Sequence, residues 1–392
     1  MNILLVSTRY HNSSPSGENI VVERERELLV LQGHQVDKYE DDNSRFKRHG
    51  LVGLITAFFS GIWSFGSYKR IAILLNSKHY DVVHVHNTFP ALSTSILFLL
   101  RRRGVSTFLT LHNYRFFCVN GTLFRKGKIC TKCLKANCCF PGLIGRCYKS
   151  SFIAGIPAFI SSILFKYLNL FKNRKIKYIA LTEFQRVTLV TNKLINSNDI
   201  SVKPNFVFPF CSQEELVREN TILFIGRFSE EKGIMTLLEN WERIDHRGYI
   251  LQLVGDGPLR KLIQQEYASC SDLQILDKVD PCVVRDYMAR AKYTIFPSIW
   301  FETFGLTIIE SYSVGTPVLA SNIGSNSELV KDGVTGFLYN PFIRDEFVSL
   351  VDKLIANEGS YYETMSMNCL QTYESKYTPE KNYRTMMQIY SL

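Results

Sequence analysis

The chain alternates short apolar runs with amphipathic stretches, a pattern typical of parallel strands covered by helices. In the first half, apolar runs that indicate strands lie at 3–7, 81–86, 107–112 and 178–181. Turn-forming residues at 13–17 precede a helical apolar stripe at 20–29. The pattern restarts in the second half, with strands at 221–225, 252–254, 293–296 and 317–320 and helices at 233–241, 259–267 and 307–314. The sequence therefore predicts an α/β protein with two Rossmann-like, doubly wound domains.

The two halves join at Lys203-Pro204-Asn205. We expect an N-terminal domain at 1–204, a C-terminal domain at 205–375, and a final helix at 376–392 that packs back on the N-terminal domain. In doubly wound sheets the ligand binds outside the carboxyl ends of the strands. The expected active site is therefore a cleft across which the two domains face each other.

Charge is divided unevenly between these halves. Residues 1–205 hold 29 Lys+Arg and 11 Asp+Glu, a balance of +18, whereas the rest hold 17 and 25, a balance of −8. Between Arg45 and Lys177 there are 22 basic residues and one acidic residue, Asp81. Such a surface attracts anions, which leaves nucleic acid, phosphorylated ligands and acidic membranes as candidate partners.

Two segments of the basic half, 51–68 and 151–171, are hydrophobic but interrupted by glycine, serine or lysine. A membrane span needs about 20 apolar residues, so neither segment is expected to cross a bilayer. Basic residues border both, which is typical of interfacial helices on anionic lipid; amphipathic core helices are the alternative. Residues 1–8 lack the features of a secretory leader, so a cytoplasmic location is expected.

Six of the ten cysteines lie within 118–147. In a reducing compartment, a clustered Cys-x-x-Cys is more typical of a metal or redox site than of a disulfide framework. Cys130 and Cys133 are candidates to share one structural zinc ion with Cys118 and with Cys147 or Cys138, and we predict Cys147 as the fourth ligand. The alternative is reduced cysteines packed in an irregular insertion.

The segment 300–310 follows a predicted strand and enters a predicted helix. Gly305, Leu306 and Thr307 would then offer free backbone amides at the positive end of a helix dipole, where a diphosphate could bind. Glu302 in the loop and Glu310 in the helix would contact different parts of one ligand. Ordinary surface acids near a helix start are the alternative.

Arg227 and Lys232 follow the strand at 221–225, so two cations lie at the carboxyl end of a strand in the acidic half. A guanidinium grips phosphate oxygens with its planar fork, and an ammonium adds a point charge. No Asp-x-Asp follows a predicted strand. Fixed cations and helix amides can stabilise a diphosphate leaving group without a metal ion. His84 and His86 also need no metal, because hydrogen-bonded packing in a strand explains them.

These residues resemble the motifs of a known family. Glu302 to Glu310 matches the E-x7-E signature of retaining glycosyltransferases with the GT-B fold. Further blocks resemble glycosyltransferase family 4: Gly226-Arg227, Glu231-Lys232-Gly233, Val254-Gly255-Asp256-Gly257-Pro258-Leu259, Gly315-Thr316-Pro317-Val318 and Asp332-Gly333-Val334-Thr335-Gly336. The first half is similar to members that build bacterial surface polysaccharides, through Gly17, Val83-His84-Val85-His86-Asn87, Thr110-Leu111-His112-Asn113 and the cysteine-bearing stretch.

The resemblance implies donor binding by Gly17, Arg227, Lys232, Phe304, Gly305, Leu306, Thr307 and Glu310, and catalysis by His112 and Glu302. Arg227 and Lys232 would hold the donor diphosphate, and Glu310 would bind the nucleotide ribose. Glu302 and the amides of 304–307 would contact the donor sugar and phosphates. His112 would reach the transferred sugar from the other side of the cleft.

The expected function is a retaining, metal-independent glycosyltransferase that moves a hexose from UDP- or GDP-hexose to a polyprenyl-diphosphate-linked saccharide in O-antigen or capsule assembly. It would be peripheral on the cytoplasmic face of the inner membrane, with the basic N-terminal domain on anionic lipid and the acceptor. No cofactor is expected for catalysis, and zinc would be structural. The alternatives are a zinc-containing nucleic-acid-binding protein, for which no recognisable nucleic-acid motif is present, and a sugar-nucleotide-cleaving enzyme of the same fold.

Overall fold

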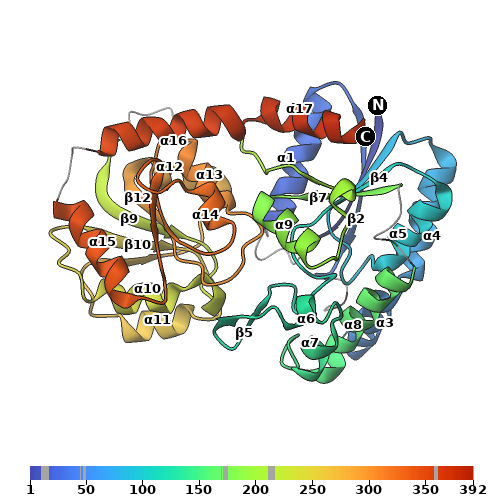
Figure 1. The fold of residues 1–392 in the computed structure, drawn as a ribbon, viewed down its shortest axis with the longest axis horizontal. Coiled ribbons are helices and arrows are strands. Elements are labelled where there is room, and N and C mark those ends of the chain that lie inside the picture. Colours follow the sequence, from blue (N-terminus) through green and yellow to red (C-terminus); the bar gives the residue numbers. More distant parts are fainter. Residues whose placement is uncertain are drawn as a thin grey trace. The chain divides into compact units, whose positions relative to one another are not determined.

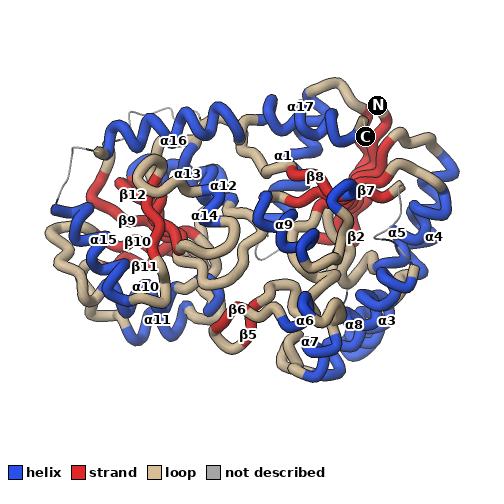
Figure 2. Tube along the Cα trace, in the orientation of Figure 1, coloured by secondary structure: helices blue, strands red, loops and turns tan. Residues whose placement is uncertain are grey.

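The computed structural model describes residues 1–9, 17–44, 46, 50–168, 170, 175–210, 217–356 and 361–391. The predicted turn at 13–16 and the cations Arg45, Lys47, Arg48, Lys172 and Arg174 lie outside the described residues. The chain forms two compact units: one comprises Met1–Arg125, Cys130–Asn205 and Asn382–Leu392, and the other comprises Lys126–Ile129 and Phe206–Lys381. Each unit is built on its own six-stranded parallel sheet (Figures 1 and 2).

The first unit has the strand order β2-β1-β3-β4-β7-β8. Its strands are β1 (Asn2–Arg9), β2 (Gln35–Asp42), β3 (Val82–Val85), β4 (Thr107–Thr110), β7 (Ile176–Ala180) and β8 (Ile200–Val202). Its helices are α1 (Gly17–Leu31), α3 (Gly50–Ile62), α4 (Phe65–Ser77), α5 (Thr94–Arg103), α8 (Phe152–Tyr167), α9 (Glu183–Thr191) and the end of α17 (Pro379–Tyr390). The central strands β3 and β4 are wholly buried, which explains their continuous apolar sequence.

The second unit has the order β11-β10-β9-β12-β13-β14. Its strands are β9 (Glu219–Ile225), β10 (Ile250–Val254), β11 (Leu273–Leu276), β12 (Ala291–Phe296), β13 (Val318–Ser321) and β14 (Gly336–Tyr339). Its helices are α10 (Ile234–Trp241), α11 (Arg260–Glu266), α12 (Pro281–Arg290), α13 (Leu306–Tyr312), α14 (Asn326–Leu329), α15 (Arg344–Ala356) and α16 (Tyr362–Lys376). This is the Rossmann strand order, as the sequence predicted for a doubly wound domain.

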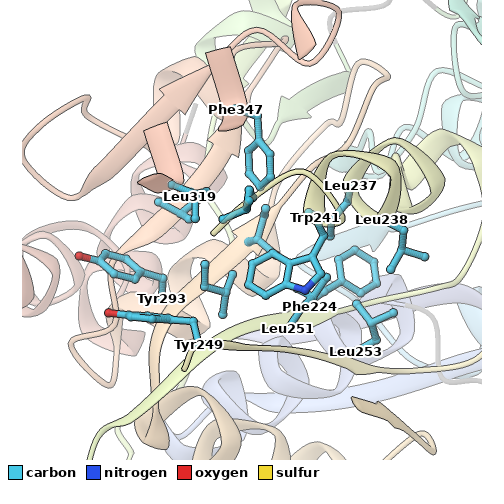
Figure 3. Close-up of a cluster of buried hydrophobic side chains, with 14 of the residues drawn as sticks. Phe224, Leu237, Leu238, Trp241, Tyr249, Leu251, Leu253, Tyr293, Leu319 and Phe347 are labelled. Carbon is cyan, nitrogen blue, oxygen red and sulfur yellow. The ribbon is translucent and has the colours of Figure 1, made fainter. Parts of the chain in front are cut away.

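The core of the second unit is aromatic on one face of its sheet (Figure 3). Trp241 at the end of α10 is 1% exposed and stacks on His246, with ring centroids 4.4 Å apart. Leu237 and Leu238 bury the same face of α10, opposite Leu251 and Leu253 of β10. Replacing a buried tryptophan by alanine costs about 3–5 kcal/mol in such a core. This packing fixes the helix that follows the loop with Lys232.

The helix α3 is unusual because it buries its glycines and exposes its large side chains. Its only buried residues are Gly53 and Gly61, and Gly61 packs against Pro157 of α8 and Phe89. Leu51, Leu54, Phe59 and other large apolar side chains of this helix are more than half exposed. No single described helix is long and apolar enough to span a membrane, although α3 and α4, bent by 58°, meet the length and composition criteria as a pair.

The segment between β4 and α8 consists of short elements joined by irregular backbone. These are the two-stranded pair β5 (Phe124–Arg125) and β6 (Lys128–Ile129) and the helices α6 (Lys132–Lys135) and α7 (Phe140–Ile144). The helix α7 packs on α8 (Figure 1). The cysteine-rich part of the sequence therefore lies in a segment of short elements and irregular backbone.

Candidate active site

In the second unit, the strand order reverses between the neighbouring strands β9 and β12. Strand β9 is followed first by β10 on one side, and β12 then begins the other side of the sheet. Ligands of doubly wound sheets bind at the carboxyl ends of the strands beside such a reversal. The loops that follow β9 and β12 carry Arg227, Lys232 and Glu302, three of the predicted site residues.

Gly233 brings the loop after β9 into contact with the loop after β12. It has a left-handed backbone with φ +70°, and a Cβ at this position would lie 2.1 Å from the carbonyl oxygen of Pro297. Next to it, the amide of Ile299 donates a hydrogen bond of 3.0 Å to the carbonyl of Glu231. Only glycine allows this close approach, which places Lys232 beside the β12 loop.

Lys232 and Glu302 form an ion pair, with 2.5 Å between Nζ and Oε1. Ser298 also donates a hydrogen bond of 2.9 Å to Oε1 of Glu302. The ammonium of Lys232 lies 5.5 Å from the ring centre of Phe296 and 5.6 Å from that of Trp300. Glu302 is 5% exposed, whereas Lys232 is partly exposed, so the pair presents a cation at the rim and a carboxylate below it.

Arg227 follows Gly226 at the end of β9 and is exposed. Among the described residues, its guanidinium has no hydrogen-bond or ion-pair partner, so it is available to an anion. The backbone beneath it is tightly packed, because a Cβ on Gly255 would lie 2.0 Å from the carbonyl oxygen of Gly226. The amide of Phe228 also donates to the carbonyl of Asp256, at 2.9 Å. These contacts hold the loops after β9 and β10 together.

The helix α13 begins at Leu306, with Gly305 at its N-cap and no side-chain cap. The amides of the first turn of a helix have no partner within the helix, so those of Leu306 and Thr307 can donate to a ligand. Phe304 is buried, and Glu310 is partly buried within the helix. The structure therefore keeps Glu302 in the loop and Glu310 in the helix, the arrangement that the sequence predicted.

In the first unit, the strand order reverses between β1 and β3. Gly17 is the first residue of α1, and the carboxylate of the next residue, Glu18, is held from two strand ends. Asn87, after β3, donates to Oε2 at 3.0 Å, and Asn113, after β4, donates to Oε1 at 2.9 Å. The Asn87 side chain also accepts a hydrogen bond from the amide of Thr8 and donates one to the carbonyl of Thr8. Glu18 was not predicted, although its asparagine partners lie in the quoted motifs.

His112 follows β4 and lies against His86, with 3.1 Å between His112 Nε2 and His86 Nδ1. The two rings stack, with centroids 5.3 Å apart. Behind them, Nε2 of His86 lies 3.6 Å from Oε2 of Glu25, and Oε1 of Glu25 accepts a 2.5 Å hydrogen bond from Lys203. Glu25 and Lys203 are fully buried, and His86 is 1% exposed.

Charges and burial together set the protonation of this group. Burial raises the pKa of Glu25, but the attraction of Lys203, His86 and His112 outweighs it and leaves the pKa below its usual value. Burial lowers the pKa of His86 and of His112, although nearby carboxylates oppose this effect. An anionic Glu25 beside a neutral His86 favours the proton on Nε2 of His86, so that its Nδ1 accepts the hydrogen bond from His112.

Three groups in this cluster, Glu25, His84 and His86, have ligand atoms within 4.8 Å of one another. A metal ion does not fit their existing contacts. Both ring nitrogens of His84 face hydroxyl groups, Thr110 at 2.8 Å and Tyr390 at 2.7 Å. The ammonium of Lys203 already neutralises Glu25. Hydrogen-bonded packing therefore accounts for both ring nitrogens of His84.

The four predicted cysteine ligands, Cys118, Cys130, Cys133 and Cys147, line one small cavity. Cys138 is exposed and does not line it.

The sequence analysis missed Glu18, Glu25 and Lys203 because each lies far along the chain from its partners. The only available signal was an acidic residue on the otherwise apolar face of α1, with Glu25 beside Val21, Val22, Leu28 and Leu29 among its buried residues.

Comparisons with known proteins show what the chain is similar to. Residues 211–370 match the family described as "Glycosyl transferases group 1". The chain is 24% identical over 346 residues to a 2-deoxystreptamine N-acetyl-D-glucosaminyltransferase of Niallia circulans, covering 86% of this chain and 82% of that protein. It is also 24% identical over 330 residues to an uncharacterized protein in the cps region of Klebsiella pneumoniae, covering 81% and 80%.

The fold is similar to that of Anabaena HepE solved in complex with UDP, with a TM-score of 0.64, 16% identity and 100% of both chains covered. This likeness concerns the fold alone. Residues 211–370 thus match a glycosyltransferase family, and the chain as a whole has the GT-B fold.

Proposed function

We propose that the protein is a retaining glycosyltransferase that moves a hexose from a nucleotide diphosphate sugar to a lipid-linked saccharide acceptor in surface polysaccharide assembly. The observation that carries the proposal is the pairing of Lys232 with Glu302 where the strand order of the second sheet reverses. A cation for phosphate and a carboxylate for sugar hydroxyls then lie side by side, with Arg227 exposed on the neighbouring loop.

In the proposed reaction, the bond between the hexose C1 and the diphosphate oxygen breaks, and the diphosphate leaves with the electron pair. An acceptor hydroxyl forms the new bond to C1 on the same face and passes its proton to the departing diphosphate oxygen. Arg227, Lys232 and the first amides of α13 stabilise the charge that develops on the leaving group. These groups need no divalent metal for this role, so catalysis is proposed to be metal-independent.

The diphosphate competes with Glu302 for Lys232. When the donor binds, its phosphate oxygens take the ammonium, and the carboxylate turns to the hydroxyls of the hexose. Removal of the carboxylate therefore harms sugar transfer more than nucleotide binding. Removal of the ammonium harms nucleotide binding first, because a charge-assisted hydrogen bond contributes about 1.5–3 kcal/mol.

His112 is proposed to contact the transferred sugar. Its Nε2 lies 3.1 Å from Nδ1 of His86, whose own Nε2 lies 3.6 Å from the carboxylate of Glu25. A buried, neutral imidazole in a fixed orientation can hydrogen-bond a sugar hydroxyl without adding a positive charge beside the reacting carbon.

A UDP- or GDP-hexose donor and a polysaccharide product fit what is known of the relatives. HepE was solved with UDP, and the Klebsiella relative lies in a cps region. The acceptor is proposed to be a polyprenyl-diphosphate-linked saccharide, because the chain up to residue 205 carries a balance of +18 that suits an anionic lipid. Nucleic acid is not proposed as a partner.

The exposed apolar side chains of α3 support attachment to the cytoplasmic face of a membrane. Leu51 is 74% exposed, and Leu54 and Phe59 are each 63% exposed. On α8, which packs against α3, Ile153 is 68% exposed. Apolar side chains of this size gain free energy by entering the boundary between lipid headgroups and acyl chains. The surrounding cations would bind anionic headgroups.

Donor screening tests the enzymatic part of the proposal. Purified protein is incubated with UDP- and GDP-hexoses and detergent-dispersed lipid-linked saccharides, without added divalent metal, and product anomers are assigned by NMR. We expect nucleotide diphosphate release and an anomeric configuration equal to that of the donor. Glu302→Gln should abolish transfer but retain nucleotide binding, whereas Glu266→Gln, an exposed carboxylate on α11, should match the wild type. Inverted product, or full activity of Glu302→Gln, would overturn the assignment.

Vesicle sedimentation tests the membrane part. The wild type should pellet with vesicles containing anionic lipid and be released by salt. Leu54→Glu should reduce binding strongly, because it places a charge in the inserted face of α3. Val217→Glu, at an apolar position of the second unit that is 77% exposed, should bind like the wild type. Equal binding of all three proteins would contradict insertion of α3.

A further inference from the structure

The cavity lined by four cysteines lies between β4 and α8, in a segment that the proposed catalytic chemistry does not use. Its walls include Cys118, Cys130, Cys133 and Cys147, together with Phe124, Arg125, Lys132, Pro141 and Gly142. Its volume is about 10 Å³, which is close to the space of one water molecule or one metal ion. We propose that these four cysteines bind one zinc ion that holds the segment 118–147 in its fold.

The spacing of the four cysteines suits this role. Cys130 and Cys133 form a Cys-x-x-Cys around the start of α6, while Cys118 and Cys147 come from either end of the segment. One ion would thus tie together parts of the chain that are up to 29 residues apart. Structural zinc sites with four thiolates are tetrahedral and closed, with Zn–S bonds of about 2.3 Å.

The structure also discriminates between the six cysteines of the segment. Cys138 is exposed. Cys139 is buried in an apolar cluster with Phe89, Val119 and Ala158, and its thiol faces the carbonyl of Phe116. Neither lines the cavity. This selects Cys147 over Cys138 as the fourth ligand, a choice that spacing alone leaves open.

The segment 118–147 has little regular secondary structure and strained backbone, so an internal cross-link would stabilise it. Its regular elements span two to five residues each. Non-glycine residues with left-handed backbone cluster here and just beyond it, at Leu123, Lys126, Asn137, Arg146, Lys149 and Ser150. Such conformations are unfavourable and persist only where the surrounding structure holds them. Small metal-bound modules obtain this support from the ion rather than from an apolar core.

Charge around the cavity favours thiolates bound to a cation. Zinc with four thiolates carries a net charge of −2, and Arg125 and Lys132 line the same cavity. Residues 115–149 contain eight basic and no acidic residues. Zinc supplies the positive charge that thiolates buried in such a cavity need.

The sulfur atoms must move closer together to bind one ion. No three of the sulfur atoms lie within 4.8 Å of one another, whereas a tetrahedral site with Zn–S bonds of about 2.3 Å brings them to about 3.8 Å. The thiol of Cys133 contacts that of Cys139, so it must turn away from this neighbour. Gly142 provides the room, because a Cβ there would lie 3.1 Å from the Cys133 sulfur.

Metal analysis of the full chain, purified under reducing conditions, tests the proposal. We expect one zinc per chain and release of that zinc on titration of four thiols with a mercurial reagent. Cobalt substitution should give the visible bands of tetrahedral thiolate coordination. Cys130→Ser and Cys147→Ser should lose at least tenfold in zinc affinity, whereas the matched control Cys138→Ser should retain one equivalent.

The proposal would be overturned by the absence of stoichiometric zinc in the wild type, by unchanged zinc affinity in Cys147→Ser, or by loss of zinc in Cys138→Ser. If a ligand variant does not fold, the mercurial titration of the wild type still decides, because it counts the thiols that release the ion. A count of fewer than ten free thiols in the denatured, metal-free protein would point instead to a disulfide and would refute the zinc site. None of these readouts depends on transferase activity.

Discussion

The Lys203→Met substitution removes the ammonium group that neutralises the buried carboxylate of Glu25. Both side chains are fully buried, and Nζ and Oε1 are 2.5 Å apart. The neighbouring imidazoles of His84 and His86 have lowered pKa values, so protonating them to replace the lost positive charge costs free energy. The variant therefore leaves an anion inside the first unit without its cation.

The expected destabilisation follows from this burial. At an effective dielectric constant of about 20, two charges 2.5 Å apart attract by ~7 kcal/mol, and much of this offsets the cost of removing them from water. Removal of one partner of a buried pair costs about 3–5 kcal/mol. For a domain of this size, 1 kcal/mol corresponds to roughly 2–4 °C, so the melting temperature should fall by about 6–20 °C.

The stability difference between the wild type and Lys203→Met should also change with pH. In the wild type, Glu25 has a lowered pKa, so its contribution to stability is present above the pKa of the unfolded chain and is lost as the pH falls through the folded pKa. In Lys203→Met, we expect burial to outweigh the remaining attraction of His86 and His112 and to raise the pKa of Glu25 above its unfolded value. That variant gains stability relative to the wild type as the pH falls, and its deficit should grow between pH 5 and pH 8.

Thermal and denaturant unfolding between pH 5 and pH 8 provide the assay. The double variant Glu25→Gln/Lys203→Met should be more stable than Lys203→Met alone, because no uncompensated charge remains. Lys177→Met is the control, since Lys177 and Asp199 are partly exposed and 3.2 Å apart, and it should cost less than about 1 kcal/mol. The reasoning would be refuted if Lys203→Met lost no more unfolding free energy than this control. It would also be refuted if that loss did not depend on pH.

Two further predictions concern the strand-end loops. Gly233→Ala should lower both the stability and the affinity for UDP, because the added Cβ meets the carbonyl of Pro297. The control is Gly248→Ala, where φ is +83° and nothing lies within 4 Å of the added Cβ, and it should cost only about 1 kcal/mol of stability. Equal melting temperatures for the two variants would contradict the close approach at Gly233. His86→Phe removes the nitrogen that contacts His112, so it should lower kcat at least tenfold and leave the affinity for UDP unchanged. An unchanged kcat in a steady-state assay would exclude this positioning role of His86.

The strands that the sequence predicted are the buried ones, because full burial on both faces produces continuous apolar runs. Strand β2, with the sequence Gln-Val-Asp-Lys-Tyr-Glu-Asp-Asp, was missed because it is an edge strand that carries mostly charged side chains. Strands β8 and β11, also at sheet edges, span only three and four residues. Their place in the fold follows from pairing with a neighbour, a long-range contact that local periodicity does not encode.

The candidate site was predictable where its residues follow strands in sequence, as Arg227, Lys232 and Glu302 do. The family resemblance nominated His112 but not the residues that support it. Glu25 lies in the middle of a helix and Lys203 is 178 residues further along the chain, so only the folded first unit brings them together. For the cysteines, spacing nominated the ligands, and the cavity separated Cys147 from Cys138.

The central claim is that the ends of β9 and β12 bind the diphosphate of a nucleotide sugar through Lys232. Calorimetric titration of UDP, GDP and their parent nucleosides measures the contribution of the diphosphate to affinity. Lys232→Ala should weaken diphosphate binding roughly 10- to 150-fold, equivalent to about 1.5–3 kcal/mol, and leave nucleoside binding unchanged. Lys261→Ala, an exposed lysine on α11, should bind like the wild type. If Lys232→Ala retains the full preference for the diphosphate, the proposed donor site is wrong.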